Sequence, residues 1–450
     1  MIEFLLDIFK ENKHDDAIIW RGQTFSYHWL HERVLQWQND LTKNNVPPGS
    51  VVILEADFSP NAVALFLALI EHNCILVPLT KSVESKKAEF TEIAEGEIRI
   101  SIADDDSVRF YRLPHQATRE LYSVLRARRH PGLILFSSGS TGKSKAALHD
   151  LTGMLEKFKA RRNKQRTITF LLYDHIGGVN TMLYTLSNGG CVITVQERSP
   201  EKVLEAVEKH RVELLPTSPT FINMVLLSEA YKHHDLSSLK TVTYGTEPMP
   251  ESTLKRFHEL FPNITLQQTY GLSEVGILRS KSKSSDSLWV KIGGEGFETR
   301  VVDGILHIKA ESAMLGYLNA PSPFTEDGWF ITGDEVEADG EYFRILGRRS
   351  ELINVGGEKV YPAEVESVIQ QIENVAVVTV YGEKNPITGN IVCADVRLHE
   401  PEDTKVAILR IKKYCRAQMP TFKVPVKINI VDNEMHGERF KKMRVQVTKE

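Results

Sequence analysis

The stretch with the clearest potential for chemistry lies between residues 133 and 145 and reads LILFSSGSTGKSK. Its first four residues form a short apolar run, which predicts a buried strand. Glycine then leaves the backbone free to curl so that successive N–H groups can point at one anion, while hydroxyl and ammonium groups add donors and charge. These groups belong to Ser137, Ser138, Gly139, Ser140, Thr141, Gly142, Lys143 and Lys145. We therefore expect the loop to bind a polyphosphate.

Two other interpretations of this loop are open. The Walker pattern G-x-x-x-x-G-K-[ST] requires glycine where this chain has Ser137, and no Walker-B aspartate stands out, which disfavours a P-loop phosphotransferase. The second alternative is an ordinary surface loop rich in glycine and serine. Further motifs elsewhere in the chain have to decide between these readings and a dedicated nucleotide site.

Residues 138–145 resemble the phosphate-binding signature of the acyl-activating, adenylate-forming superfamily, which includes acyl-CoA synthetases, luciferase and peptide-synthetase adenylation domains. The resemblance implies an enzyme, an AMP-forming acid–thiol ligase. Such an enzyme couples a carboxylic acid to ATP, releases pyrophosphate and passes the acyl group to a thiol. It also implies that Lys143 is catalytic and stabilises the charge that moves onto pyrophosphate.

A second stretch, Gln268–Glu274, follows a predicted strand and matches the family pattern Y-G-x-[ST]-E. By this resemblance Tyr270 and Gly271 contact adenine, Ser273 bonds phosphate, and Glu274 is catalytic and holds Mg²⁺, since carboxylate oxygen is a hard ligand. An earlier loop resembles the family's adenine-edge loop and supplies Gly245, Thr246 and Glu247. Without the resemblance, either stretch reads as an ordinary turn.

A third stretch, Gly328–Asp334, resembles the segment whose aspartate binds the ribose. The two oxygens of Asp334 fit a vicinal diol, and the resemblance gives Arg348 a contact with the ribose or phosphate. His175 matches the family histidine of an H-x-x-G turn, which gives it catalytic and substrate-binding roles. A histidine that only caps its own turn is the alternative. The residues expected to face the acid are Asp174, His175, Thr220, Thr246 and Leu272.

The rest of the chain predicts how these turns are positioned. Alternating strands and helices predict an α/β fold: a large N-terminal domain, residues 1–349, of helix-covered, mostly parallel sheets with a β-barrel-like subregion. Residues 154–164 are expected to form a helix after the phosphate loop. Residues 350–450 are expected to form a small, mobile α+β domain that rotates at Ser350. Its turn at Gly356 and Gly357 resembles the family turn that faces the thiol arm.

The sequence departs from the family near its C-terminus. The usual motif G-K-x-x-[RK] places a catalytic lysine after glycine, but here Gly437 is followed by Glu438. A glutamate there would repel phosphate and carboxylate. Arg439, Lys441 and Lys442 are the nearby cations that could replace the lysine, and we assign the catalytic role to Lys441. The departure leaves open a nucleotide-binding homologue with impaired adenylation. The acceptor is coenzyme A or the phosphopantetheine arm of an acyl carrier protein, and the acid is aryl, fatty or amino-bearing.

Composition limits the remaining possibilities. The chain has 450 residues, a formal net charge of −4 and four widely spaced cysteines. This charge gives no reason to expect nucleic acid or a membrane surface as a partner, and the N-terminal residues lack a secretory pattern. Unpaired cysteines favour a reducing compartment. We therefore expect a cytoplasmic protein, as a monomer or homodimer.

Overall fold

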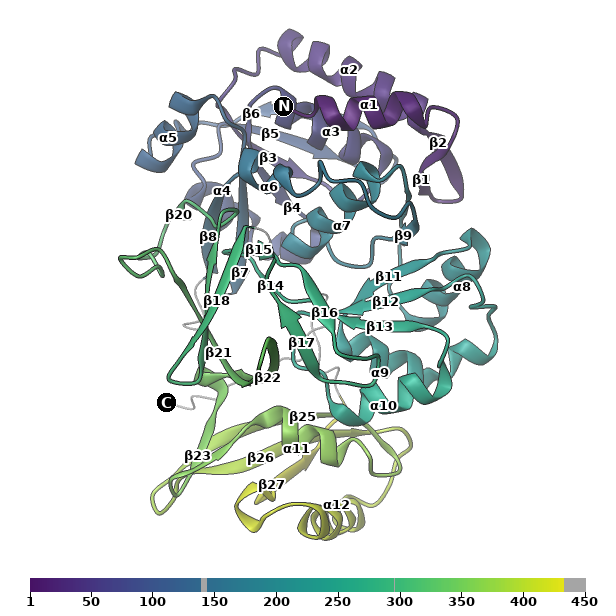
Figure 1. The fold of residues 1–450 in the computed structure, drawn as a ribbon, viewed down its shortest axis with the longest axis vertical. Coiled ribbons are helices and arrows are strands. Elements are labelled where there is room, and N and C mark those ends of the chain that lie inside the picture. The colour runs from purple at the N-terminus through teal and green to yellow at the C-terminus, as the bar shows by residue number, and fades with distance from the viewer. Residues whose placement is uncertain (139–143, 295, 433–450) are drawn as a thin grey trace.

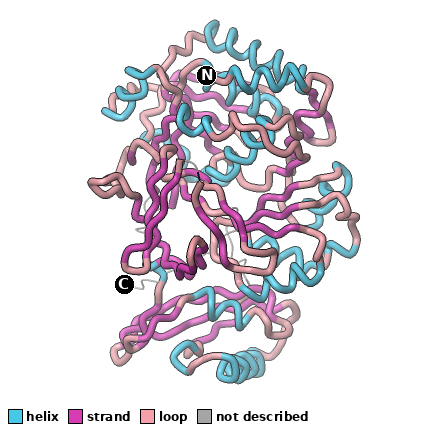
Figure 2. The backbone as a smooth tube through the Cα atoms, in the orientation of Figure 1, coloured by secondary structure: helices cyan, strands magenta, loops and turns pink. Residues whose placement is uncertain are grey.

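The computed structural model describes residues 1–138, 144–294 and 296–432, and Figure 1 shows a large N-terminal part above a smaller C-terminal unit. The N-terminal part contains two seven-stranded sheets, one six-stranded sheet and a two-stranded ribbon. Figure 2 shows helices between and outside the large sheets. Among the residues that the structure describes, no helix combines the length and apolar character needed to cross a membrane.

The first large sheet carries the phosphate loop. Its strands, in spatial order, are β20 (Gly316–Tyr317), β8 (Ser144–Asp150), β7 (Gly132–Ser138), β4 (Ile75–Leu79), β3 (Val51–Glu55), β5 (Ile98–Ile102) and β6 (Val108–Arg112). β7, β4, β3 and β5 are parallel, whereas β20, β8 and β6 are antiparallel to their neighbours. The expected phosphate loop therefore lies in the sequence between two paired antiparallel strands, β7 and β8.

The second large sheet has the order β13 (Thr265–Gln268), β12 (Thr241–Tyr244), β11 (Leu214–Thr217), β9 (Arg166–Ile168), β10 (Cys191–Ile193), β1 (Asp16–Trp20) and β2 (Gln23–Ser26). All neighbours are parallel except β1 and β2. In parallel sheets the carboxyl ends of the strands meet at one edge, where ligands bind. The turns after β12 and β13 are therefore placed side by side.

Helices cover both sheets, because alternate side chains of each strand face opposite layers. Val52 and Leu54 of β3 face the central core, whereas Val51 and Ile53 face the outer one. The central layer contains α1 (Glu3–Glu11), α2 (Tyr27–Lys43), α3 (Pro60–Glu71), α6 (Leu151–Glu156) and α7 (Ile176–Ser187). The outer layers contain η1 (Lys81–Lys86), α4 (Lys87–Ile93) and α5 (Glu120–Arg128) on one side, and α8 (Pro200–His210), α9 (Pro219–Ser228), η2 (Ala230–Lys232) and α10 (Glu251–Leu260) on the other.

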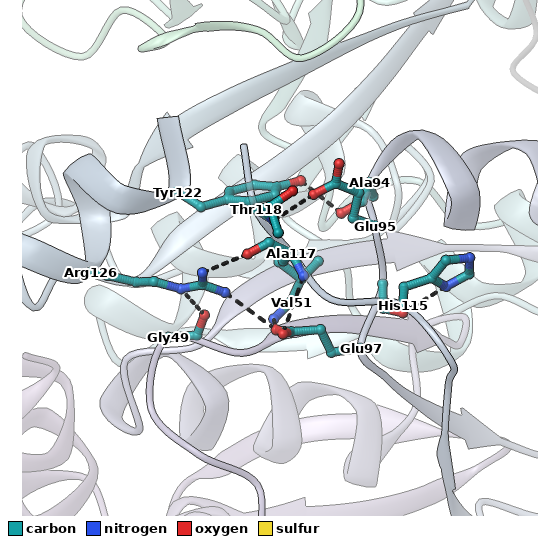
Figure 3. Close-up of polar contacts among 11 residues, drawn as sticks. Gly49, Val51, Ala94, Glu95, Glu97, His115, Ala117, Thr118, Tyr122 and Arg126 are labelled. Atoms are coloured by element: carbon teal, nitrogen blue, oxygen red, sulfur yellow. Dashed lines mark hydrogen bonds and ion pairs between the residues drawn. The ribbon is translucent and has the colours of Figure 1, made fainter. Parts of the chain in front are cut away.

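A polar network fixes α5, the helix that leads into β7 (Figure 3). Glu97 accepts hydrogen bonds from the Val51 N–H at 2.9 Å and from the Ala117 N–H at 3.3 Å. The Arg126 guanidinium donates to the carbonyls of Gly49 and Ala117 and pairs with Glu97 at 3.4 Å. The Glu97 carboxylate thus connects α5 and the segment before it to β3. The start of β7, which follows α5, is held in place by these contacts.

The six-stranded sheet is antiparallel throughout and forms the barrel-like part. Its order is β16 (Ser280–Ser282), β17 (Trp289–Ile292), β22 (Tyr342–Arg348), β21 (Phe330–Asp339), β19 (Ile305–Ala310) and β18 (Phe297–Val302). The short ribbon β14 (Gly271–Leu272) with β15 (Gly276–Ile277) joins it to the second large sheet. Tyr270 packs in the core of this region.

The C-terminal unit has its own sheet and core. The strands are β23 (Ile353–Val355), β24 (Glu358–Val360), β25 (Val375–Asn385), β26 (Gly389–Leu398) and β27 (Lys427–Ile430), with η3 (Arg349–Glu351), α11 (Pro362–Ile369), α12 (Thr404–Gln418) and η4 (Thr421–Lys423). The unit touches the N-terminal part where the Ser252 hydroxyl donates to the Ser367 carbonyl at 3.1 Å. The expected fold class, α/β with mostly parallel sheets, a barrel-like part and a small α+β unit, is confirmed.

The expected helix over residues 154–164 is wrong. The helix α6 spans Leu151–Glu156 and is only six residues long. The residues that follow are mainly charged or amide-bearing, KFKARRNKQR, and offer no repeating apolar face to bury. An amphipathic helix has no reason to continue there, and the chain instead crosses to β9 as an irregular segment.

Candidate active site

Two of the three expected nucleotide-binding turns meet at Asp334. The Tyr270 hydroxyl donates to Asp334 Oδ2 at 2.5 Å, and Arg348 Nε lies 2.8 Å from Oδ1. Asp334 on β21 stands opposite Arg348 on β22, whereas Tyr270 comes from the end of β13. Burial and the adjacent Asp334 carboxylate raise the pKa of Tyr270, which keeps its hydroxyl protonated as a donor. Residues separated by more than 60 positions thus form one cluster.

Glu274 joins this cluster to the strand that follows the phosphate loop. Its Oε1 accepts a hydrogen bond of 2.5 Å from the hydroxyl of Tyr317, which lies on β20 beside β8. Lys145 of β8 lies over the Tyr317 ring, with Nζ 5.2 Å from the ring centroid. Burial by itself lowers the pKa of the Arg348 guanidinium. The negative charges of Asp334 and Glu274 outweigh burial and raise this pKa overall, so Glu274 lies within electrostatic reach of Arg348.

Tyr317 is a site residue that sequence reasoning did not identify. Residues 313–317 match a family stretch, but that match assigns no role to the tyrosine. Burial and the Glu274 carboxylate raise the pKa of Tyr317, so its hydroxyl stays a donor that orients this carboxylate. Its role depends on pairing between β20 and β8, a contact that spans about 170 residues and leaves no local signal.

Most of the expected phosphate loop lies outside the described residues. This applies to Gly139, Ser140, Thr141, Gly142 and Lys143, and their predicted roles stay predictions. The described ends of the loop are the last pairs of the hairpin, Ser137 with Lys145 and Ser138 with Ser144. The described strand β8 pairs with β20, whose Tyr317 contacts Glu274.

The expected adenine-edge loop lies directly beside the second turn. A Cβ on Gly245 would stand 2.7 Å from Thr269 Oγ1 and 2.9 Å from the Thr269 carbonyl oxygen, so only glycine permits this approach. Thr246 has φ +73°, a conformation that is strained for a β-branched residue and characteristic of functional sites. Glu247 accepts hydrogen bonds from the backbone and hydroxyl of Thr220 at the start of α9.

The turn between β9 and α7 has a structural role, of which the sequence indicated the His175 cap as an alternative but not the contact of Asp174. Asp174 is buried and accepts hydrogen bonds from the Thr80 hydroxyl at 3.0 Å and the Thr80 N–H at 3.4 Å. It therefore links the edge of the second large sheet to the first. His175 caps α7, because its Nδ1 accepts from the Gly177 N–H at 3.1 Å. The structure gives His175 the capping role, and its catalytic role stays a prediction.

A cavity of about 1210 Å³ opens beside this turn. It borders Gly177, Asn180, Thr181 and Tyr184, which share one face of α7, and it reaches Thr243 and Thr269 at the ends of β12 and β13. The expected acid-facing residues Asp174, His175, Thr220, Thr246 and Leu272 are not among the described residues that line it, although several of their neighbours are. The helical spacing after His175 is the sequence signal that would have indicated Asn180 and Tyr184.

The glycine turn of the C-terminal unit is exposed. Gly356 and Gly357 have φ +61° and +96° and connect β23 to β24. The Gly357 N–H donates to Asn354 Oδ1 at 2.8 Å, which holds the turn in shape. Lys441 and Glu438 lie outside the described residues, so the structure leaves their roles as sequence predictions.

Glu335, the neighbour of Asp334, connects the two parts of the chain. It is 3% exposed and accepts hydrogen bonds from Arg349 at 2.8 Å, Lys359 at 3.0 Å and Tyr361 at 2.9 Å. Burial raises the pKa of Glu335, but these hydrogen bonds outweigh it and lower the pKa overall. Arg349 borders the expected hinge at Ser350, and Lys359 and Tyr361 lie beyond it, so this cluster spans the hinge.

His149 on β8 packs beside the turn that contains Ser273, and we predict that it makes stability depend on pH. It is fully buried, and backbone groups of Ser273 and Ser312 face its ring. Burial lowers the pKa of His149 from 6.5 to about 4. The unfolded chain therefore binds a proton below pH 6.5 that the folded chain binds only near pH 4, so stability falls as the pH falls through this range.

For His149 we expect a loss of about 3 kcal/mol in the free energy of unfolding between pH 6.5 and pH 4. The measurement is urea unfolding at a series of pH values for the wild type and for His149→Gln, whose side chain does not titrate. The wild-type curve should fall more steeply than that of the variant. Parallel curves for the two proteins would contradict a neutral buried imidazole.

Comparison with known proteins agrees with this geometry. The family described as "AMP-binding enzyme" matches residues 7–318, and "AMP-binding enzyme C-terminal domain" matches residues 364–441. Indoleacetate–CoA ligase from Aromatoleum aromaticum is 29% identical over 296 residues, which cover 59% of this chain and 57% of the relative. Feruloyl-CoA synthase from an Amycolatopsis species is 25% identical, with 93% of this chain and 92% of the relative covered.

A solved structure shows the same fold. The crystal structure of an anthranilate–CoA ligase in complex with anthranoyl-AMP superposes with a TM-score of 0.82 at 20% identity, covering 97% of this chain and 95% of that one. The resemblance to adenylate-forming enzymes inferred from the motifs is thereby confirmed. Since the first family match spans more than half of the chain, this protein belongs to the AMP-binding enzyme family.

Proposed function

We propose that this protein activates a carboxylic acid with ATP as an acyl-adenylate, releases pyrophosphate, and transfers the acyl group to the thiol of coenzyme A. The observation that carries the proposal is the cluster formed by Tyr270, Glu274, Tyr317, Asp334 and Arg348 beside the strand that leaves the phosphate loop. These side chains suit a nucleotide. Tyr270 offers a buried aromatic ring for the base, the Asp334 carboxylate suits the ribose diol, and Arg348 and Glu274 offer charges for phosphate and for its metal ion.

The chemistry follows from where charge moves. The acid's carboxylate attacks the α-phosphorus of ATP, a bond forms between carboxylate oxygen and phosphorus, and the bond to the pyrophosphate oxygen breaks. Negative charge accumulates on the leaving pyrophosphate, so the contribution of the protein is positioning and electrostatic stabilisation. In this proposal Asp334 holds the ribose, and Arg348 pairs with Asp334 within electrostatic reach of Glu274. The role of stabilising the leaving group stays with Lys143 and its loop as a sequence prediction, because they lie outside the described residues.

The donor set at Glu274 fits a Mg²⁺ ion that arrives with ATP. Over the part of the chain that the structure describes, no cluster of three or more His, Cys, Asp or Glu side chains is arranged to hold a metal. Mg²⁺ is commonly held through one or two carboxylates together with substrate phosphates, and Glu274 supplies one such carboxylate. When bound, the ion neutralises charge on the phosphates; Tyr317 keeps the Glu274 carboxylate oriented toward that place.

The thiol step needs a path for a narrow pantetheine arm. Glycine at positions 356 and 357 lets the backbone lie flat, and the exposed turn is free to approach the site when the C-terminal unit rotates about Ser350. The named relatives that use coenzyme A support it as the acceptor. The arm of an acyl carrier protein has the same chemistry and is the alternative acceptor. Location in the cytoplasm, as a monomer or homodimer, belongs to this proposal.

A test of the reaction distinguishes the rivals. Purified protein is incubated with ATP, Mg²⁺, coenzyme A and a panel of aryl, fatty and amino acids, and the nucleotide products are separated. AMP, pyrophosphate and an acyl-CoA support the proposal, whereas ADP indicates a phosphotransferase. An acyl-adenylate that forms without thioester, and is released only by a carrier protein, selects the alternative acceptor. ATP that stays intact with every acid contradicts adenylation.

A second candidate, an adenylate-binding homologue with impaired adenylation, rests on Glu438 in the lysine position. We expect instead that Lys441 replaces that lysine: Lys441→Ala should lower pyrophosphate exchange by about 10- to 100-fold, the value of one charge-assisted hydrogen bond. Glu438→Ala should leave the exchange rate near that of the wild type. A reversed pattern, or exchange that is negligible in the wild type, would select the impaired homologue.

A further inference from the structure

The large cavity next to the proposed acid site has walls of unusual polarity for a hydrocarbon substrate. On β12, Thr241 and Thr243 face the cavity, whereas Val242 and Tyr244 point into the apolar core on the other side of the sheet. Gln267 also faces the cavity. Because burying a hydroxyl or amide against hydrocarbon without a partner is unfavourable, these walls suit an acid with polar groups beyond its reactive carboxylate.

Cations also line this cavity, in the segment after α6 and between β15 and β16. The cavity is lined by Lys157, Arg162 and Arg279, and none of the described carboxylates forms an ion pair with any of these three. Glu311 is the carboxylate without an ion pair among the described lining residues, so positive charge is in excess over that described part of the wall. Lys159, by contrast, lines the rim and pairs with Glu156 at 2.6 Å.

Lys157 is the cation placed deepest. Its side chain is half-buried, and Nζ donates to the Ile277 carbonyl at 3.1 Å. Ile277 on β15 pairs with Gly271 of β14, and Gly271 belongs to the expected Y-G-x-[ST]-E motif. Lys157 therefore contacts the strand that pairs with the proposed nucleotide-binding turn. Burial and the nearby Arg162 lower the pKa of Lys157 to about 8, so an anion placed against this ammonium group would stabilise its charged form.

We propose that the acid activated by this enzyme carries a second carboxylate, which binds in this cavity against Lys157, with Arg162 and Arg279 at the mouth. This inference rests on the proposed adenylation and adds the substrate class, a dicarboxylic acid. One carboxylate reacts at the α-phosphorus of ATP near Glu274, and the other stays ionised in the cavity. With about 1210 Å³, the cavity has room for a ring or chain between the two groups.

The experiment compares each diacid with its own monomethyl ester, which has nearly the same shape and one charge less. Pyrophosphate release is measured with ATP and Mg²⁺ for a series of aliphatic and aromatic diacids of increasing length. We expect a preference in kcat/KM of at least about tenfold for the best diacid over its ester, as one charge-assisted contact provides. Lys157→Met should remove most of this preference through the KM for the diacid, with the KM for ATP unchanged.

Two further variants separate this role from a merely structural one. Lys157→Arg keeps the charge and should keep the preference, which also shows that the position tolerates substitution. Lys159→Met removes a rim cation that is already paired with Glu156, and it should leave the preference intact. Esters that react as well as their diacids, or a preference that survives Lys157→Met, would overturn the proposal.

Failure of the proposed function gives a different result. If no acid yields pyrophosphate, binding of the same diacids and esters is measured by calorimetry on the wild type and Lys157→Met in the presence of AMP. Tighter binding of a diacid than of its ester, lost in Lys157→Met, supports the second-carboxylate site even without catalysis. Equal binding of diacid and ester, or binding of neither, overturns it.

Discussion

Replacing Glu274 with glutamine should lower kcat for pyrophosphate release by about 10²- to 10³-fold, the range found when one preorganised charge-stabilising group is removed. The amide has the shape of the carboxylate and still accepts the hydrogen bond from Tyr317, so the fold is retained. What is lost is the negative charge proposed to hold Mg²⁺ against the phosphates. The measurement is a coupled pyrophosphate assay at several Mg²⁺ concentrations, in which the variant should need more Mg²⁺ than the wild type.

Tyr317→Phe is the matched control for this result. It leaves the Glu274 charge in place and removes the 2.5 Å hydrogen bond that orients it. We expect a loss of about 10- to 100-fold, smaller than that of Glu274→Gln, because one hydrogen bond to a charged group is at stake. If Glu274→Gln keeps nearly full activity, or if the two variants lose equal amounts of activity, Glu274 does not act through its charge.

Asp334→Ala should raise the KM for ATP by about 100-fold or more, because a bidentate contact with the ribose is lost and Arg348 loses its partner. The variant should also be less stable by about 1–3 kcal/mol, since the buried Tyr270 hydroxyl loses its acceptor. Steady-state kinetics with ATP, 2′-deoxy-ATP and 3′-deoxy-ATP provide the specific readout. The wild type should prefer ATP, and the variant should treat the three nucleotides alike.

Asp339→Asn provides the control on the same strand. Asp339 is exposed, and its nearest cation, Lys283, stands at 3.8 Å, so its charge contributes little. We expect its nucleotide preference and stability to match the wild type. An Asp334→Ala variant that still discriminates against both deoxynucleotides would exclude Asp334 from the ribose site.

The sequence allows prediction of those parts of the site that depend on the ends of strands. Tyr270 and Gly245 follow neighbouring parallel strands, whose carboxyl ends share an edge. That these turns bind a nucleotide is implied by the family resemblance, and so is the role of Asp334. The structure brings Asp334 and Tyr270 together through a hydrogen bond, as convergence of the turns requires.

Residues whose partners are distant in sequence could not be predicted. Asp174 looks like a pocket residue, but its partner is Thr80, 94 positions earlier, and no local pattern indicates that contact. Tyr317 depends on the pairing of β20 with β8. Lys157 was expected inside a helix; it becomes a cavity residue because α6 ends at Glu156. In each case the deciding interaction is a tertiary contact, which composition and periodicity do not encode.

The adjacent carboxylates Asp334 and Glu335 of β21 connect the proposed nucleotide site to the expected hinge. Successive side chains of a strand point to opposite faces, so Asp334 meets the nucleotide cluster while Glu335 grips Arg349, Lys359 and Tyr361. Adjacent residues of β21 therefore contact the proposed nucleotide site and the residues that flank the expected hinge. If the C-terminal unit rotates as proposed, the contacts of Glu335 with Lys359 and Tyr361 must break, and these contacts lie one residue away from the carboxylate proposed to bind the ribose.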